Sequence, residues 1–123
     1  MVVLAALALF QLKHSVCDFA LQTKRQIRAK GNYGALGGLE HAGLHAFLSL
    51  PALLVLTRAP FLIGALLGGE FLVHYHVDWS KAQIDRARRL NDTGRSYWIV
   101  FGFDQLLHQM TYLGIVFVVL WLI

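Results

Sequence analysis

Four long apolar stretches constrain the fold of this chain more than any other feature. They cover residues 2–21, 39–57, 60–79 and 97–123. Each is close to or above the roughly 20 residues that an α-helix needs to cross the hydrocarbon core of a bilayer. A helix of a soluble bundle would carry a polar stripe, whereas Thr111 to Ile123 is apolar all round. The sequence therefore predicts an all-α fold, with residues 1–123 forming a single domain of four transmembrane helices.

The composition excludes several other classes of protein. Hydrophobic residues make up 57% of the chain and charged residues 15%, which is too apolar for a disordered chain and unusual for a small water-soluble domain. The single cysteine, Cys17, excludes an internal disulfide and any zinc motif built from several cysteines. A membrane protein without a disulfide framework remains.

The basic residues are concentrated in two of the connecting segments. Residues 22–38 and 80–96 together carry nine of the eleven Lys and Arg. The positive-inside rule places both segments in the cytoplasm and both termini in the periplasm, as in a multi-pass protein of a bacterial inner membrane. The net charge of +4 is then explained by topology and anionic lipid, and no nucleic acid partner is expected. Ser80 to Leu90 is predicted to form a separate short helix on the membrane surface.

Histidine and aspartate recur at one spacing. Each apolar stretch contains one pair of these residues four positions apart, where random placement would give roughly one pair in the whole chain. Residues four apart lie on the same face of a helix, so each pair projects as a unit. Counted from the basic segments, all four pairs fall in one layer near the cytoplasmic side. The eight residues are His14, Asp18, His41, His45, His74, Asp78, Asp104 and His108.

Such a layer predicts a metal centre. Buried ionisable groups are costly unless a cation compensates them. Three aspartates with neutral histidines carry −3, which two divalent ions and a bridging hydroxide would neutralise. Imidazole and carboxylate ligands suit zinc first, with iron or manganese as alternatives, and one or two ions are expected.

Other polar residues close to the His and Asp pairs are candidates for catalysis or substrate binding. Glu70 and Asp104 are candidates for the general base of a reaction. Glu70 is equally a candidate for an extra metal ligand or for a structural partner of Lys13 or a histidine. Lys13 and Arg95 are candidates to hold an anionic headgroup, and snorkelling of their charged ends to the membrane surface is the alternative. His76 breaks the spacing, so it is expected to face away from the layer. Gly64 and Gly68, four apart, would allow another helix to approach closely.

Several motifs carry a resemblance to known families. The runs EFLVHYHVDW (residues 70–79), FGFDQLLHQ (residues 101–109), KHSVCDF and HAGLH resemble a family of small bacterial and phage membrane proteins of unknown function. The arrangement of His and Asp is also loosely similar to that of membrane-bound metal-dependent hydrolases regulated by the LexA repressor. The first resemblance implies a small membrane protein, and the second implies metal-dependent hydrolysis without assigning a role to any single residue.

Three functions follow from these patterns. The first is a metal-dependent membrane hydrolase acting on a lipid-linked or headgroup-bearing substrate. The second is a metal or haem carrier, with histidines on opposing helices as axial ligands. The third is a non-catalytic accessory subunit of a larger membrane complex. Membrane lipids, and a homo-oligomer or a larger complex, are the expected partners.

Overall fold

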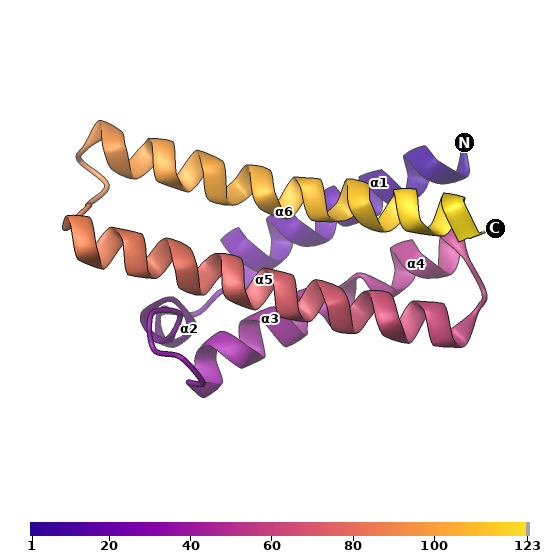
Figure 1. Ribbon diagram of the computed structural model, residues 1–123, viewed down its shortest axis with the longest axis horizontal. Coiled ribbons are helices and arrows are strands. Elements are labelled where there is room, and N and C mark those ends of the chain that lie inside the picture. The colour runs from indigo at the N-terminus through magenta and orange to yellow at the C-terminus, as the bar shows by residue number, and fades with distance from the viewer. Residues whose placement is uncertain (123) are drawn as a thin grey trace.

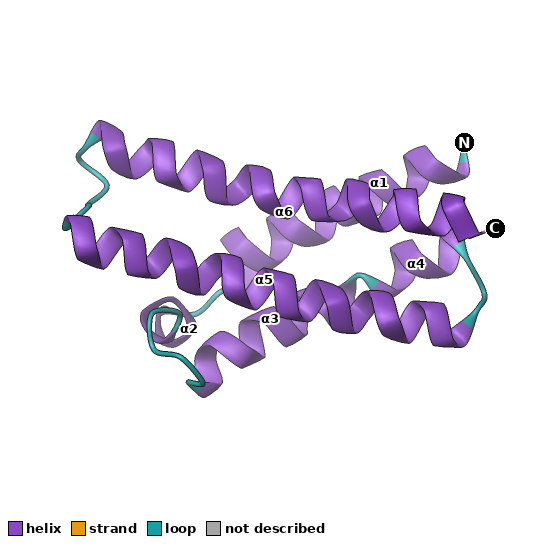
Figure 2. Cartoon of the chain, in the orientation of Figure 1, coloured by secondary structure: helices purple, strands orange, loops and turns teal. Residues whose placement is uncertain are grey.

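The computed structural model describes residues 1–122, and every regular element in that part of the chain is a helix (Figure 1, Figure 2). The prediction of an all-α fold is therefore confirmed. The last residue of the fourth predicted stretch, Ile123, lies outside the described residues. In chain order the elements are α1 (Val2–Ser15), the π-helix η1 (Val16–Leu21), α2 (Lys24–Ala29), α3 (Leu36–Leu48), α4 (Leu50–Leu56), α5 (Pro60–Arg88) and α6 (Arg95–Leu122).

The long helices run up and down beside one another. α5 and α6 lie antiparallel, with α1 behind α6; in the view of Figure 1, α3 lies below α5 and α4 is seen between α5 and α6 near the termini. Both labelled termini and the α4–α5 connection lie at one end, while α2 and the α5–α6 loop lie at the other. The two basic segments therefore share one end of the molecule, which is called the basic end below.

The prediction of four membrane spans is wrong in number. Within residues 1–122, three segments are long and apolar enough to cross a membrane: Val2–Leu21, Leu36–Leu56 and Arg95–Leu122. α5 is long enough, but Glu70, His74, His76 and Asp78 make its central turns polar. The groups that predict a metal centre are thus the same groups that lower the hydropathy of the helix carrying them.

α5 also continues through the region predicted as a separate surface helix. It extends without interruption from Pro60 to Arg88 and ends at Arg89, whose φ of 51° is left-handed. Residues 81–88 contain good helix formers and neither Gly nor Pro, so nothing in the sequence stops the helix at Ser80. The stop comes at Asn91 to Gly94, a turn sequence.

The second span is broken where α3 gives way to α4. Pro51 has no backbone N–H, so the helical hydrogen bonds are interrupted there. Ser49, at the junction, donates its hydroxyl to the carbonyl of His45 over 3.2 Å. The junction therefore stabilises the turn of α3 that carries His45.

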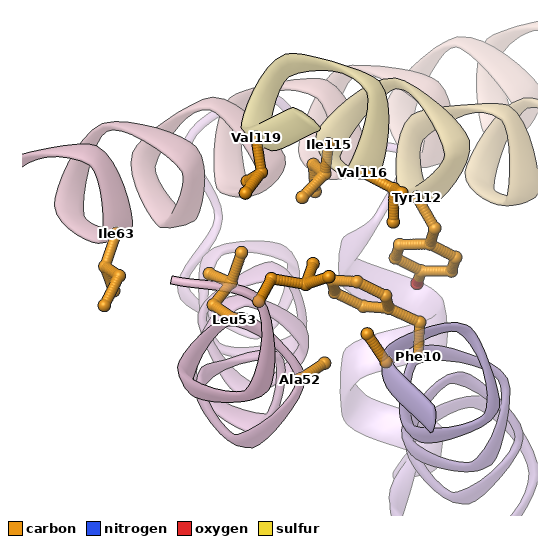
Figure 3. Close-up of a cluster of buried hydrophobic side chains, with 10 residues drawn as sticks. Phe10, Ala52, Leu53, Ile63, Tyr112, Ile115, Val116 and Val119 are labelled. Atoms are coloured by element: carbon orange, nitrogen blue, oxygen red, sulfur yellow. The ribbon is translucent and has the colours of Figure 1, made fainter. Parts of the chain in front are cut away.

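An apolar core fills the end of the bundle opposite the basic end. Figure 3 shows Phe10 of α1 and Leu53 of α4 packed beneath the side chains of α6. The rings of Phe10 and Tyr112 stack with centroids 5.0 Å apart. Outside this core many large apolar side chains are exposed, for example Phe61 at 93% and Trp121 at 77%. A surface of this kind suits lipid or another membrane helix better than water.

Candidate metal centre

The four His and Asp pairs meet in one layer between the apolar core and the basic end. Five helical elements contribute to it: α1, η1, α3, α5 and α6. The layer is defined by its eight residues, His14, Asp18, His41, His45, His74, Asp78, Asp104 and His108, and is called the polar layer below. Seven of these side chains are buried, and Asp18 is half-buried. The i,i+4 spacing thus brings side chains far apart in sequence to one depth.

Four of these side chains form a first group of possible metal ligands. Asp18, His41, His45 and His74 each offer one ligand atom, and these atoms lie within 4.8 Å of one another. Asp18 Oδ1 is 3.2 Å from His41 Nε2 and 3.0 Å from His45 Nε2. Asp18 lies in η1, and π-helical turns are frequent at functional sites. This group could hold a metal ion.

A second group contains His74, Asp78 and His108, so His74 belongs to both. Asp78 Oδ2 lies 3.3 Å from His74 Nε2, and Asp78 Oδ1 lies 3.4 Å from His108 Nε2. Neither nitrogen makes a hydrogen bond within the described part of the chain, although both are fully buried. The His74 and His108 rings are packed with centroids 4.1 Å apart. These three side chains could hold a metal ion.

Two predicted ligands lie in the polar layer but outside both groups. His14 contacts other side chains through both ring nitrogens: Nδ1 is 2.9 Å from the Tyr112 hydroxyl, and Nε2 is 2.9 Å from Gln105 Oε1 and 3.2 Å from Asp18 Oδ2. Asp104 Oδ2 accepts a hydrogen bond of 3.1 Å from Gln105, while Oδ1 is buried, has no partner within residues 1–122, and lies 3.6 Å from His108 Nε2. His14 is therefore placed to orient neighbouring side chains, and Asp104 keeps one oxygen free beside the second group.

Lys13 and Glu70 pair with each other behind His45. Lys13 Nζ forms an ion pair with Glu70 Oε1, and both side chains are almost completely buried. Lys13 also donates to the backbone carbonyl of His45 over 3.1 Å. The Lys13 ammonium is therefore paired with Glu70 and not placed to bind a headgroup. One oxygen of Glu70 is likewise occupied by Lys13 and not placed to accept a proton in a reaction.

Two further residues lie away from the polar layer. Arg95 is exposed at the first residue of α6, about 13 Å along the helix axis from Asp104 at 1.5 Å per residue. His76 is exposed on α5, where its Nδ1–H donates to the carbonyl of Leu72 over 2.7 Å and Nε2 lies 3.0 Å from the Tyr33 hydroxyl. The structure therefore brings neither residue to the candidate ligands.

The sequence analysis missed four polar residues that contact the layer: Gln22, Lys30, Gln105 and Tyr112. Lys30 Nζ lies 2.9 Å from Asp78 Oδ2, and Gln22 Nε2 lies 3.0 Å from His41 Nε2. Tyr112 continues the spacing of Asp104 and His108 by four residues, so the sequence does contain its signal. Lys30 carries no such signal, because nothing local separates it from the other basic residues of its segment.

A cavity of about 320 Å³ opens beside the polar layer at the basic end. It is called the inner cavity below. Four aspartates, Asp18, Asp78, Asp85 and Asp104, and two lysines, Lys30 and Lys81, are its charged lining residues. Burial opposes the charge of Lys81, but the Asp85 carboxylate 2.7 Å away raises the pKa of its ammonium above the usual value. Lys81 therefore stays cationic at the edge of the candidate site.

Comparison with known proteins identifies a family but no activity. A family model described as a protein of unknown function (DUF3307) matches residues 6–123. No curated protein and no solved structure matches the chain. Similarity to the LexA-regulated hydrolases is not shown.

Proposed function

Because the chain belongs to DUF3307, a family of unknown function, we propose its function from the polar layer: it is a metal-dependent membrane hydrolase whose substrate carries a polar headgroup on a lipid. The bond cleaved is a phosphoester or an amide of that headgroup. Zinc is the proposed metal, because imidazole and carboxylate are the ligands it prefers and no thiolate is present in either group.

One observation carries this proposal. Around Asp78, three buried polar atoms have no hydrogen-bond partner within residues 1–122: His74 Nε2, His108 Nε2 and Asp104 Oδ1. Leaving a buried polar atom unpaired costs about 1–3 kcal/mol. A cation bound to the two nitrogens and to Asp78 would remove most of that cost, which supports a metal at this position.

The two ligand groups differ in the number of ligands that they provide, and therefore in whether a coordination position remains for water. The group of His74, Asp78 and His108 provides three ligands, the number that catalytic zinc sites use while keeping one position for water. A single imidazole nitrogen binds one ion, so an ion that takes His74 here leaves Asp18, His41 and His45 for a second. We assign the reactive ion to the three-residue group because that group leaves a position for water, and because Asp104 Oδ1, which has no hydrogen-bond partner among the described residues, lies 3.6 Å from His108 Nε2.

The residues around that group have distinct tasks in the proposed reaction. Zinc bound there would lower the pKa of a water molecule. Asp104 would take the proton of that water, because its Oδ1 is free and close to His108. Gln105 holds the other oxygen of Asp104 and so orients the base. Lys13 and Glu70 act further away, by holding the turn that carries His45.

We further propose that the basic end faces the cytoplasm, so that the polar layer lies near the inner leaflet of a bacterial inner membrane. Nine of the eleven Lys and Arg lie in the two segments at that end. A substrate in the inner leaflet would then reach the inner cavity without crossing the apolar core.

Metal analysis of detergent-purified protein tests the metal centre. Wild-type protein should retain zinc after dialysis, and His108→Ala should lose at least half of it. His76→Ala is the matched control, because His76 lies on α5 but contacts neither ligand group. Equal metal content in His108→Ala and His76→Ala would overturn the site.

A second measurement separates binding from reaction. Asp104→Asn should retain zinc while hydrolysis falls by 100-fold or more, the usual scale for loss of a general base. Hydrolysis is measured by mass spectrometry on lipids extracted from bacterial membranes. Zinc-loaded wild-type protein that leaves every extracted lipid unchanged would overturn the enzymatic function and retain the metal centre.

A further inference from the structure

A groove of about 550 Å³ runs along the outside of the bundle between α5 and α6. The two helices lie side by side along this length (Figure 1). The lining is mostly apolar, with Val77 and Ile84 on α5 and Val100 and Phe103 on α6. The volume falls in the range of about 300–1,000 Å³ typical of sites for small organic molecules. The groove therefore has the size and surface to hold a hydrocarbon chain.

The groove adjoins the inner cavity. Lys81 and Asp104 line both spaces, so they lie on the border between them. Lys81 is held in place by Asp85 and by the Tyr97 ring, whose centroid lies 4.6 Å from Nζ. Asp104 is the residue proposed above as the general base. A molecule occupying the groove would thus end next to an ammonium group and the candidate metal ligands.

The charge of the inner cavity indicates what that end should be. Its four aspartates and two lysines carry a net charge of −2, which two divalent ions in the polar layer, with their bound water still neutral, would change to +2. A phosphate monoester carries about −1.5 to −2 near neutral pH and would balance that charge. A neutral or cationic headgroup would leave it uncompensated.

We propose that the chain binds a lipid with a phosphate monoester headgroup, with its hydrocarbon chain in the α5/α6 groove and its phosphate in the inner cavity beside Lys81. The inference rests on the proposed function, because the positive charge of the cavity requires the metal ions. It deepens that function by naming the substrate class. It also gives Lys81 the role that the sequence analysis assigned to Lys13 and Arg95. The groove opens sideways, so such a lipid reaches it by diffusion within its leaflet.

Binding of a lipid analogue that cannot be hydrolysed tests this proposal. Octadecylphosphonic acid has a carbon–phosphorus bond, and its binding to zinc-loaded protein in detergent can be measured by native mass spectrometry. Octadecanol carries the chain alone, and methylphosphonic acid carries the headgroup alone. The phosphonic acid should bind at least tenfold more tightly than either. Equal binding of octadecanol would overturn the phosphate part of the proposal.

Matched variants test the location. Val77→Trp fills the groove and should weaken binding of octadecylphosphonic acid tenfold or more, whereas Leu113→Trp, exposed on α6 away from the groove, should not. Ile84→Trp, at a position 42% exposed, provides a second groove variant if the first fails to fold. Lys81→Gln should bring the affinity for the phosphonic acid close to that for octadecanol. Groove variants that bind as Leu113→Trp does would overturn the location.

The metal content of each variant separates this proposal from the proposed function. Zinc-loaded wild-type protein that shows no groove-dependent binding overturns the lipid site alone. Wild-type protein that takes up no zinc overturns the metal centre, and the phosphate preference with it.

Discussion

Replacing Lys13 by Met should show how strongly the fold depends on its buried ion pair. Lys13 and Glu70 have side chains only 6% and 1% exposed, and they lie 57 positions apart in the sequence. Met is close to Lys in length and volume, so Lys13→Met opens no large cavity. The change removes the partner of a buried carboxylate, together with a hydrogen bond to the His45 carbonyl and the contact of Nζ with the Tyr112 ring, 4.6 Å from its centroid.

The expected cost follows from the contacts that Lys13 makes. Removing one partner of a buried ion pair typically costs about 3–5 kcal/mol, because an uncompensated charge remains. The hydrogen bond from Lys13 to the carbonyl of His45 adds little, since that oxygen also accepts from the backbone N–H and the hydroxyl of Ser49. Lys13→Met should thus lower the free energy of unfolding by about 3–5 kcal/mol.

The double variant Lys13→Met/Glu70→Leu provides the control. Replacing a whole buried pair by apolar residues is often neutral, so the double variant should be clearly more stable than Lys13→Met, with a coupling free energy of about 2–3 kcal/mol. Unfolding is followed by circular dichroism as sodium dodecyl sulfate is added to mixed micelles. If the effects of the two single variants simply add, the two side chains do not stabilise each other and the reasoning fails.

Three further variants or treatments test other parts of the structure. Tyr112→Phe keeps the ring stacked on Phe10 but removes the hydroxyl that contacts His14, so it should cost about 1 kcal/mol in the same unfolding assay; no change would show that this contact contributes nothing. Gly37→Ala should destabilise the fold by about 1–3 kcal/mol, because the new Cβ would lie 2.7 Å from the Cβ of Ala29. Gly64→Ala is the control and should be neutral or stabilising, because its Cβ would meet nothing within 4 Å. Equal effects of the two variants would contradict the packing of α2 on α3. Removing metal with a chelator should lower the stability of wild-type protein by about 3 kcal/mol relative to protein in zinc at 100 times its Kd, and should lower that of His108→Ala by a smaller amount, because of the two ligand groups only that of Asp18, His41, His45 and His74 is left there to hold an ion.

The sequence predicts the helical fold and most of the polar layer because both depend on local spacing. Apolar stretches locate the helices, and the i,i+4 pairs locate the faces that meet. The error in the third span has the same origin: hydropathy averages over a helix, so the inward-facing Glu70, His74 and Asp78 lower it although they face protein.

Contacts between distant helices are harder to predict. The sequence offers Lys13 as one possible partner of Glu70, but nothing near either residue decides between that ion pair and a catalytic or headgroup-binding role; the fold brings the two side chains together. In the same way Lys30 resembles its basic neighbours until the fold brings it to Asp78. Residue type and spacing thus indicate the possible ligands, while the pairing of charges depends on the tertiary structure.

The polarity of α5 has a consequence for the biogenesis of the protein. On translocon insertion scales, an aspartate near the centre of a membrane helix costs about 2.5–3.5 kcal/mol, and α5 carries both Glu70 and Asp78. α5 would therefore partition poorly into lipid on its own, so its association with a membrane depends on the neighbouring helices α3 and α6 that pack against it. With the proposed metal missing, the buried polar groups of α5 would remain uncompensated, so cells starved of zinc should degrade the protein faster and its abundance would follow zinc supply.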